Sequence, residues 1–380
     1  MASSTTKAPL KLEELTLVDT DSHAEESLDG LRPYIEDSNP GVLRFLDSAS
    51  HLRSEIYTST RATPSFSQTN WSDEPGTGGD DLVHDASSPE RKRELMEEFD
   101  IDYSILSPGV NLNLASVNHD QTAVALANAY NSWLLDTYLG EDRYDGVYAN
   151  ILVAPQAPEK AAEEIDRVAN EEGFVGVQLP ASGLVPPAGN RWYDPIYEAA
   201  HDRGLPVVMH SGNSASYSTF PVQRTWAETF TEDHAFTFPV ESMWHMISMV
   251  CQGVPERYPD LQILMQEAGV EWLPWMMWRL DDHYLQNSQD VPILQKQPSE
   301  YIKDQFTLST QPLGHTDNAQ HLAWVIEAAG GPETVAFASD HPHPDFDTPG
   351  ELFRPLNSHF DAEAVRGMMG ETAMEIFGLK

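Results

Sequence analysis

Acids and histidines stand directly after three apolar runs of this sequence, where a buried strand would end. Asp21 and His23 follow one run, His210 follows another, and Asp340 follows "TVAFAS". Asp21 and His23 are two residues apart, so their side chains would point to the same side of a strand. Two carboxylates and two imidazoles suit Zn, Mn or Fe. We therefore predict a metal site formed by Asp21, His23, His210 and Asp340.

Such a site requires that the ends of distant strands meet on one face. Helix-like segments alternate with β-rich runs, and Gly follows several of these helices at the expected C-terminal position. The eight β-rich runs are residues 15–23, 100–108, 144–155, 174–180, 205–212, 261–269, 304–312 and 334–342. This alternation predicts an α/β protein with a (β/α)8 TIM barrel, in which the carboxyl ends of the strands share one face. No Gly-rich dinucleotide motif follows the first run, which disfavours an open doubly wound sheet.

Two long segments interrupt the alternation, at residues 30–90 and 213–250. Both leave the carboxyl end of a predicted strand, so we expect insertions that cover or line the pocket, although residues 72–90 are also typical of a solvated loop. Residues 1–14 read as a disordered tail before a single barrel over 15–380. The side chains that we consider for substrate contact in these insertions are Arg61, Trp71, Arg224, Trp226, Trp244 and His245.

The charge of the chain is strongly negative, with 22 Lys and Arg against 60 Asp and Glu and a formal net charge of −38. Nucleic acid and anionic membranes are therefore unfavourable partners. The dispersed acids are typical of a protein kept in solution by concentrated salt, and full activity in dilute buffer would contradict this interpretation. With no spanning segment and no signal-peptide pattern, we expect a cytoplasmic protein acting on a small molecule.

The motifs together resemble the amidohydrolase superfamily, in the amidohydrolase-related branch that includes aminocarboxymuconate-semialdehyde decarboxylase. Asp21 and His23 match the branch's strand-one pair, His210 matches its strand-five His, and "SDHPH" at 339–343 matches its strand-eight motif. Residues 253–284 and "LSTQP" at 308–312 are similar to its strand-six and strand-seven segments, and the resemblance covers about 15–378. It implies a metal-dependent barrel enzyme.

Two departures from that branch affect the prediction. Most of its decarboxylases have a His at the end of strand six, where this chain has Glu267. Binuclear members of the superfamily use a carboxylated Lys near strand four, where this chain has Gln178. We therefore expect one divalent ion, with Zn as the first choice and Mn or Fe as alternatives.

The resemblance leaves the reaction open between two chemistries. Our first reading is hydrolysis of a small ester, lactone or amide by metal-activated water. The alternative is non-oxidative decarboxylation of an aromatic or enol carboxylic acid, and a non-catalytic binding barrel is a third reading. In either reaction Asp340 would act as acid or base, Glu267 would assist across the pocket, and His343 would support Asp340.

An aromatic block at residues 272–278 carries a further expectation. Trp272, Trp275 and Trp278 are spaced by three and Met276 lies among them, which predicts one helix face packed on the barrel. Part of this surface would alternatively form a homodimer contact.

Overall fold

The computed structural model of the protein describes residues 10–48, 88–117, 119–140, 144–212, 230–314, 318–343 and 346–380. Eight parallel strands form one sheet in chain order. They are β1 (Val18–Ala24), β2 (Tyr103–Pro108), β3 (Val147–Leu152), β4 (Phe174–Pro180), β5 (Val207–His210), β6 (Ile263–Gln266), β7 (Phe306–Ser309) and β8 (Val335–Ala336). Each of the eight predicted runs coincides with one of these strands, although β1 extends one residue beyond its run, and the (β/α)8 barrel is confirmed.

The barrel closes between its last and first strands. β8 itself is only two residues long, but the chain after it continues beside β1. Thr20 N donates to Phe337 O at 3.0 Å, Asp340 N donates to Asp21 O at 2.8 Å, and His23 N donates to His341 O at 2.9 Å. These backbone bonds hold the segments that carry Asp21, His23 and Asp340 in a fixed register.

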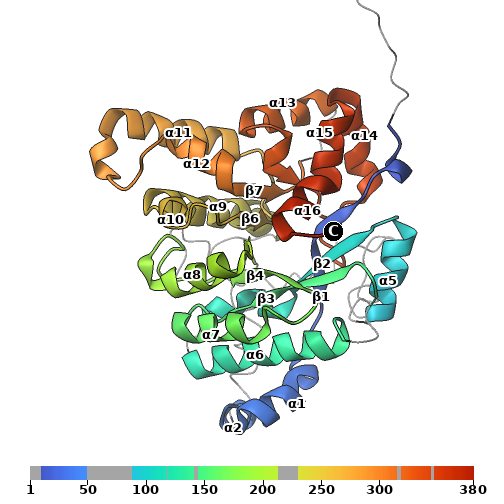
Figure 1. The fold of residues 1–380 in the computed structure, drawn as a ribbon, viewed down its shortest axis with the longest axis vertical. Helices are drawn as coiled ribbons and strands as arrows, with labels where there is room; N and C mark the ends of the chain where they lie inside the picture. Colours follow the sequence, from blue (N-terminus) through green and yellow to red (C-terminus); the bar gives the residue numbers. More distant parts are fainter. Residues whose placement is uncertain are drawn as a thin grey trace, which may run out of the picture.

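Helices surround the strands (Figure 1). The α-helices are α1 (Leu28–Ser38), α2 (Pro40–Ser48), α5 (Pro89–Glu98), α6 (Asp120–Thr137), α7 (Pro158–Val168), α8 (Asp194–Arg203), α9 (Phe230–Cys251), α10 (Val254–Arg257), α11 (Leu273–Asn287), α12 (Pro298–Gln305), α13 (Ala319–Ala329), α14 (Pro349–His359), α15 (Ala362–Arg366) and α16 (Thr372–Phe377). Short helices are η1 (Leu12–Glu14), η3 (Val110–Ser116), η4 (Arg191–Tyr193), η5 (Ser288–Asp290), η6 (Pro332–Thr334) and η7 (Gly367–Glu371). None of the helices in these described ranges is long and apolar enough to cross a membrane.

The interior of the barrel changes from apolar to polar along its axis. A small cluster that includes Ile105, Val208 and Leu264 packs against Phe377 of α16. Toward the carboxyl ends of the strands, Ser107 donates to Gln178 Oε1 at 3.1 Å, and Gln266 donates to the carbonyl of Thr20 at 2.6 Å. A satisfied polar layer therefore separates the apolar base of the barrel from the face with the predicted site.

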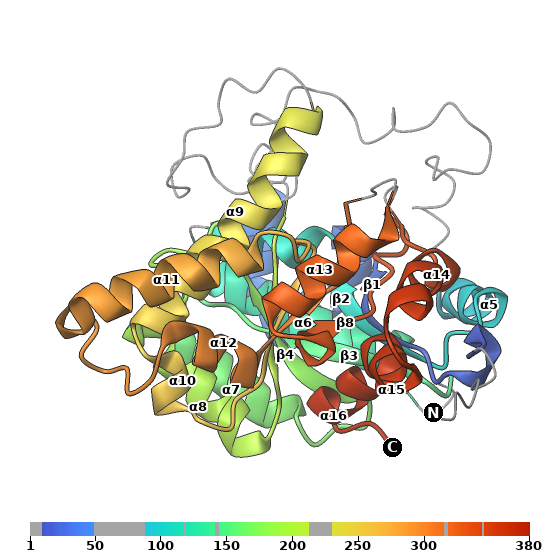
Figure 2. The same ribbon diagram turned by 90° about the horizontal axis from the view of Figure 1, so that it is seen from above.

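The ends of the predicted insertions are helical. The first contains most of α1, all of α2 and the start of α5, while residues 49–87 lie outside the described ranges. The second contributes α9, which projects beyond the other helices in Figure 2. The predicted tail 1–14 is too long, because residues 12–14 form η1 and the flanking Leu10 and Leu15 are buried.

The aromatic block lies at the start of α11, but its predicted single face is wrong. Trp272 and Met276 are buried, whereas Trp275 is 56% and Trp278 is 62% exposed. A spacing of three falls short of a 3.6-residue turn, so each step rotates the side chain off the buried stripe. The homodimer contact stays a prediction.

Candidate metal centre

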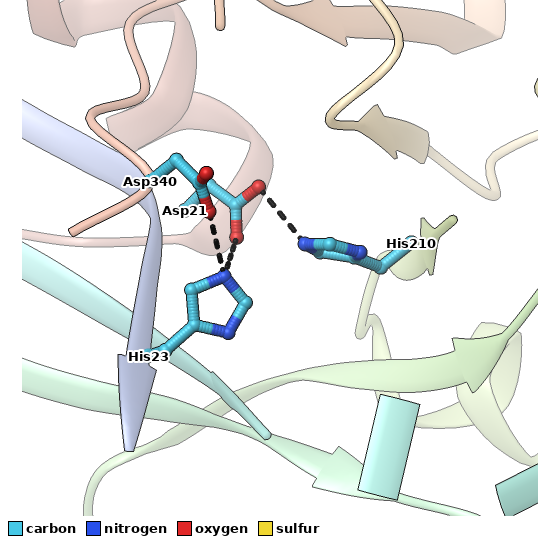
Figure 3. A group of neighbouring side chains, drawn as sticks. All are labelled: Asp21, His23, His210 and Asp340. Carbon is cyan, nitrogen blue, oxygen red and sulfur yellow. Dashed lines mark hydrogen bonds and ion pairs between the residues drawn. The ribbon is translucent and has the colours of Figure 1, made fainter. Parts of the chain in front are cut away.

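Four buried side chains converge at the carboxyl ends of β1, β5 and β8 (Figure 3). His23 Nε2 lies 2.9 Å from Asp340 Oδ1 and 3.6 Å from Asp21 Oδ1, and His210 Nε2 lies 3.2 Å from Asp21 Oδ2. One ligand atom from each of the four falls within 4.8 Å of the others. Ligands about 2.0–2.2 Å from a shared ion are separated by roughly 3–4.4 Å, so the cluster is compact enough for one metal.

The hydrogen bonds of the two imidazoles fix which ring nitrogen faces the cluster. His23 Nδ1 bonds the carbonyl of Pro108 at 2.9 Å, and His210 Nδ1 bonds the carbonyl of Ser211. A carbonyl only accepts, so both Nδ1 atoms carry a proton and both Nε2 atoms face carboxylates. This arrangement requires a cation between them, either a metal ion or an additional proton.

The unsatisfied atoms of the cluster indicate the same cation. Both carboxylate oxygens of Asp21 and the Nε2 atom of His210 are buried without a hydrogen bond. Burial lowers the pKa of His210, but Asp21, Asp340 and the carbonyl of Ser211 together outweigh burial and raise this pKa. A proton on His210 therefore serves as the substitute for the metal, and the residues present fit a divalent ion.

Asp340 is held by several partners in an unusual backbone conformation. Its φ of 62° lies in the left-handed region, where a non-glycine residue marks a position fixed by its surroundings. His343 Nδ1 bonds Asp340 Oδ1 at 2.7 Å, and Gln311 Nε2 donates to Oδ2 at 3.1 Å. Although burial raises the pKa of Asp340, His343 and His23 lower it well below its usual range. Asp340 is therefore present as a carboxylate.

His343 connects this carboxylate to the edge of the site. Its Nε2 lies 3.6 Å from Glu25 Oε1, and its ring centroid is 4.3 Å from that of His23. Burial lowers the pKa of His343, but Asp340 and Glu25 outweigh it and raise this pKa well above its usual value. The side chains of His343 and Glu25 are 23% and 17% exposed, so this ring connects Asp340 to the solvent-accessible edge of the site.

A second group, His23, Glu25 and His343, has ligand spacing but does not form a complete site. His23 Nδ1 is engaged by Pro108, its Nε2 faces the first cluster, and His343 Nδ1 is bonded to Asp340. Gln178, which stands where binuclear members have the carboxylated Lys, is hydrogen-bonded to Ser107, Asn150 and the carbonyl of Val208. Its side chain is therefore engaged within the barrel and does not bridge two ions. The described residues thus support a single divalent ion.

Glu267 follows β6 and is 4% exposed. Its Oε2 lies 3.6 Å from His210 Nε2, and its Oε1 lies 3.5 Å from Nε2 of His234 on α9. Like Asp340 it has a positive φ, of 49°. Glu267, which stands where most decarboxylases of the branch have a His, therefore contacts His210 of the four-residue cluster.

Of the six side chains predicted to contact substrate, the structure describes only Trp244 and His245. Arg61, Trp71, Arg224 and Trp226 lie outside the described residues, so their role stays a prediction. Trp244 is 42% exposed on α9. His245 is buried, its Nε2 bonds the carbonyl of Ala181 at 3.1 Å, and its Nδ1 accepts from Ala188 N at 3.3 Å. Both ring nitrogens are occupied by the backbone, so we correct the substrate role of His245 to a structural one.

Several residues around the centre were missed at the level of sequence. Lys92 of α5 is fully buried, and its Nζ lies 2.5 Å from Ser22 Oγ and 3.3 Å from His341 Nδ1. Burial and, after it, the positive charge of Lys92 lower the pKa of His341 to about 2, so this imidazole is neutral. The periodicity of α5 held a signal, because Lys92 shares its buried face with Leu95 and Met96.

The barrel and the buried N/O cluster define the class of protein as a metal-dependent barrel enzyme. The sequence pattern of the amidohydrolase family matches residues 20–379. The chain therefore belongs to the amidohydrolase family, as its motifs predicted, and is an enzyme.

Three relatives illustrate this membership. Gamma-resorcylate decarboxylase of Polaromonas sp. (strain JS666) is 25% identical over 285 residues, covering 70% of this chain and 80% of the relative. The crystal structure of 5-carboxyvanillate decarboxylase from Sphingomonas paucimobilis has a TM-score of 0.70 at 20% identity, covering 96% of this chain and 100% of that one. The crystal structure of a variant of 5-carboxyvanillate decarboxylase from Novosphingobium aromaticivorans, with bound manganese and a nitrobenzoic acid, has a TM-score of 0.69 at 19% identity. It covers 97% of this chain and 98% of that one.

Proposed function

We propose that this protein is a metal-dependent, non-oxidative decarboxylase of a hydroxylated aromatic carboxylic acid. The observation that carries the proposal is the contact of the His343 ring with both Asp340 and Glu25 beside the four buried residues, and these two carboxylates raise the pKa of His343. Decarboxylation of an arene consumes a proton at carbon, and this pair places a proton store at the site. The named decarboxylases matched over most of their length support the same reading, so hydrolysis, our first expectation from sequence, becomes the weaker candidate.

The reaction is balanced by one proton. The ring carbon that bears the carboxylate is protonated, the bond between that carbon and the carboxylate breaks, and its electron pair returns to the ring. The aromatic acid anion and a proton thus become the arene and CO2. A hydroxyl group beside the carboxylate would assist, because it raises electron density at the carbon that must accept the proton.

The residues divide the work between holding charge and supplying the proton. Asp21, His23, His210 and Asp340 would hold the ion, which when bound supplies a positive charge that orients the oxygens of the substrate. His343 passes its proton toward the reacting carbon along Asp340 and recovers it through Glu25 at the solvent edge. The network Gln311–Asp340–His23 keeps the carboxylate in place during this transfer.

Manganese is the ion that we propose, in place of the zinc expected first. Carboxylate oxygens are ligands that Mn²⁺ shares with other hard cations, and this site has two carboxylates among its four ligands. The solved decarboxylase from Novosphingobium aromaticivorans with bound manganese supports this choice.

The test uses the full chain in concentrated KCl, stripped of metal and reconstituted with Mn²⁺. We expect 2,6-dihydroxybenzoate or 5-carboxyvanillate to release one CO2 per arene formed, and chelation to abolish the release. Elemental analysis of the untreated protein gives the native ion. Hydrolysis of a matched lactone and ester panel without CO2 release would instead support the hydrolase.

A further inference from the structure

Glu267 occupies a place at the metal cluster that neither the four-ligand pattern nor the reaction explains. His210 and Gln266 are paired at the ends of the neighbouring strands β5 and β6. Glu267 therefore lies one position beyond the level of His210 along the barrel. Its amide donates to Ser309 Oγ on β7 at 3.1 Å, and its positive φ is held by this contact. The backbone therefore directs a buried carboxylate into the site from the β6 side.

Glu267 approaches the cluster at His210 Nε2, which is buried without a hydrogen bond. His210 Nε2 has its lone pair between Asp21 Oδ2 at 3.2 Å and Glu267 Oε2 at 3.6 Å. Three negatively polarised atoms at these distances repel one another unless positive charge lies among them. A separation of 3.6 Å is also the spacing of two ligands on a shared ion.

We infer that Glu267 is a fifth protein ligand of the metal, added by this chain to the set of Asp21, His23, His210 and Asp340. It contacts His210 and approaches from that side of the cluster. Glu267 is not among the four residues whose ligand atoms all lie within 4.8 Å of one another, so ligation requires its side chain to rotate toward the ion. This inference rests on the metal site of the proposed function but not on the reaction.

His234 provides the support that a ligating carboxylate needs. Its Nε2 lies 3.5 Å from Glu267 Oε1, while its ring packs on Phe238 with 4.5 Å between centroids. The imidazole thus engages one oxygen of the carboxylate and leaves Oε2 directed at His210. Outer partners of this kind orient metal ligands in proteins.

A fifth ligand changes the chemistry of the centre. Three carboxylates and two imidazoles give the site a net charge of −1 with a divalent ion, and they shift its preference toward Mn²⁺. If the bound ion takes six ligands, five from the protein would leave one position for another ligand. A substrate would then bind the ion through a single oxygen.

The experiment measures metal binding rather than turnover. Metal-free protein is titrated with Mn²⁺ and followed by electron paramagnetic resonance, for the native chain and for Glu267→Gln and Glu267→Asp. Glu271→Gln is the matched control, because Glu271 is exposed four residues away and its carboxylate accepts from the amides of Val270 and Gly314. We expect both changes at Glu267 to weaken Mn²⁺ binding more than about tenfold and the control to stay within about twofold.

Glu267→Asp separates ligation from simple charge, because it keeps the negative charge and shortens the reach by one methylene. Native affinity in this variant would overturn ligation, even if Glu267→Gln binds weakly. Co²⁺ substitution gives a second readout, since its visible bands intensify as the coordination number falls; identical spectra in all variants would also overturn it. Loss of CO2 release with native Mn²⁺ affinity in both variants would place Glu267 in the reaction and not on the metal.

Discussion

His210 and His245 are both buried histidines of this barrel, yet one is poised for chemistry and the other is not. Each has one ring nitrogen donating to a backbone carbonyl, of Ser211 and Ala181 respectively. The remaining nitrogen of His245 accepts the amide proton of Ala188, whereas that of His210 faces Asp21 without a hydrogen bond. Neither residue type nor burial separates them; the partner of the second nitrogen does.

The electrostatics of the two imidazoles follow from that partner. Burial lowers the pKa of His245 to about 4, and its backbone partner offsets this only in part. Burial acts on His210 in the same direction, but Asp21, Asp340 and the carbonyl of Ser211 together outweigh it and raise the pKa. Burial of both rings thus leads to a neutral structural ring in one place and a ring that attracts a cation in the other.

The largest expected effect is loss of the metal from the poised site. Asp21→Asn keeps the shape of the side chain but removes the charge between His23 and His210, so we expect Mn²⁺ affinity to fall more than about 100-fold and decarboxylation to reach background. His245→Gln is the control and should retain one ion per chain. The measurement is Mn²⁺ titration with elemental analysis. A full equivalent of metal in Asp21→Asn would remove the distinction between the two histidines.

A smaller effect is expected where the site handles the proton and not the metal. His343→Gln removes the imidazolium between Asp340 and Glu25, so kcat should fall about 100-fold while bound Mn²⁺ stays at the native level. Steady-state rates are compared with metal content on the same samples. Parallel loss of metal and rate would assign His343 to the coordination sphere instead.

The barrel and the grouping of Asp21, His23, His210 and Asp340 were predictable because both follow from local patterns. Apolar runs mark strands, alternation places Asp21 and His23 on one side, and parallel closure brings strand ends together whatever their distance in sequence. Asp340 and His343 belong to one short motif, so their pairing needed no long-range information.

The supporting residues could not be predicted, because their roles depend on tertiary contacts. Lys92 contacts Ser22 across 70 positions, and His234 of α9 lies near Glu267 although 33 positions separate them in the sequence. The prediction that His245 contacts substrate failed for the opposite reason. Its place in an aromatic insertion favoured substrate contact, and only the fold reveals two backbone partners.

The smallest expected effect concerns the satisfied ring. Because the amide of Gln can keep both backbone bonds, we expect His245→Gln to lower the free energy of unfolding at pH 7 by only about 1–2 kcal/mol. In the native protein the folded pKa of about 4 lies below the ordinary 6.5, so the unfolded chain takes up a proton first as pH falls. The stability tied to the neutral ring is therefore present above about pH 6.5 and lost toward pH 4, by up to roughly 3 kcal/mol. The variant lacks this titration, so in urea unfolding at constant salt the gap to native protein should close between about pH 6 and 5 and reverse in sign by about pH 4.5. A gap that stays constant from pH 7 to 4.5 would show that His245 is not held neutral by its two backbone partners.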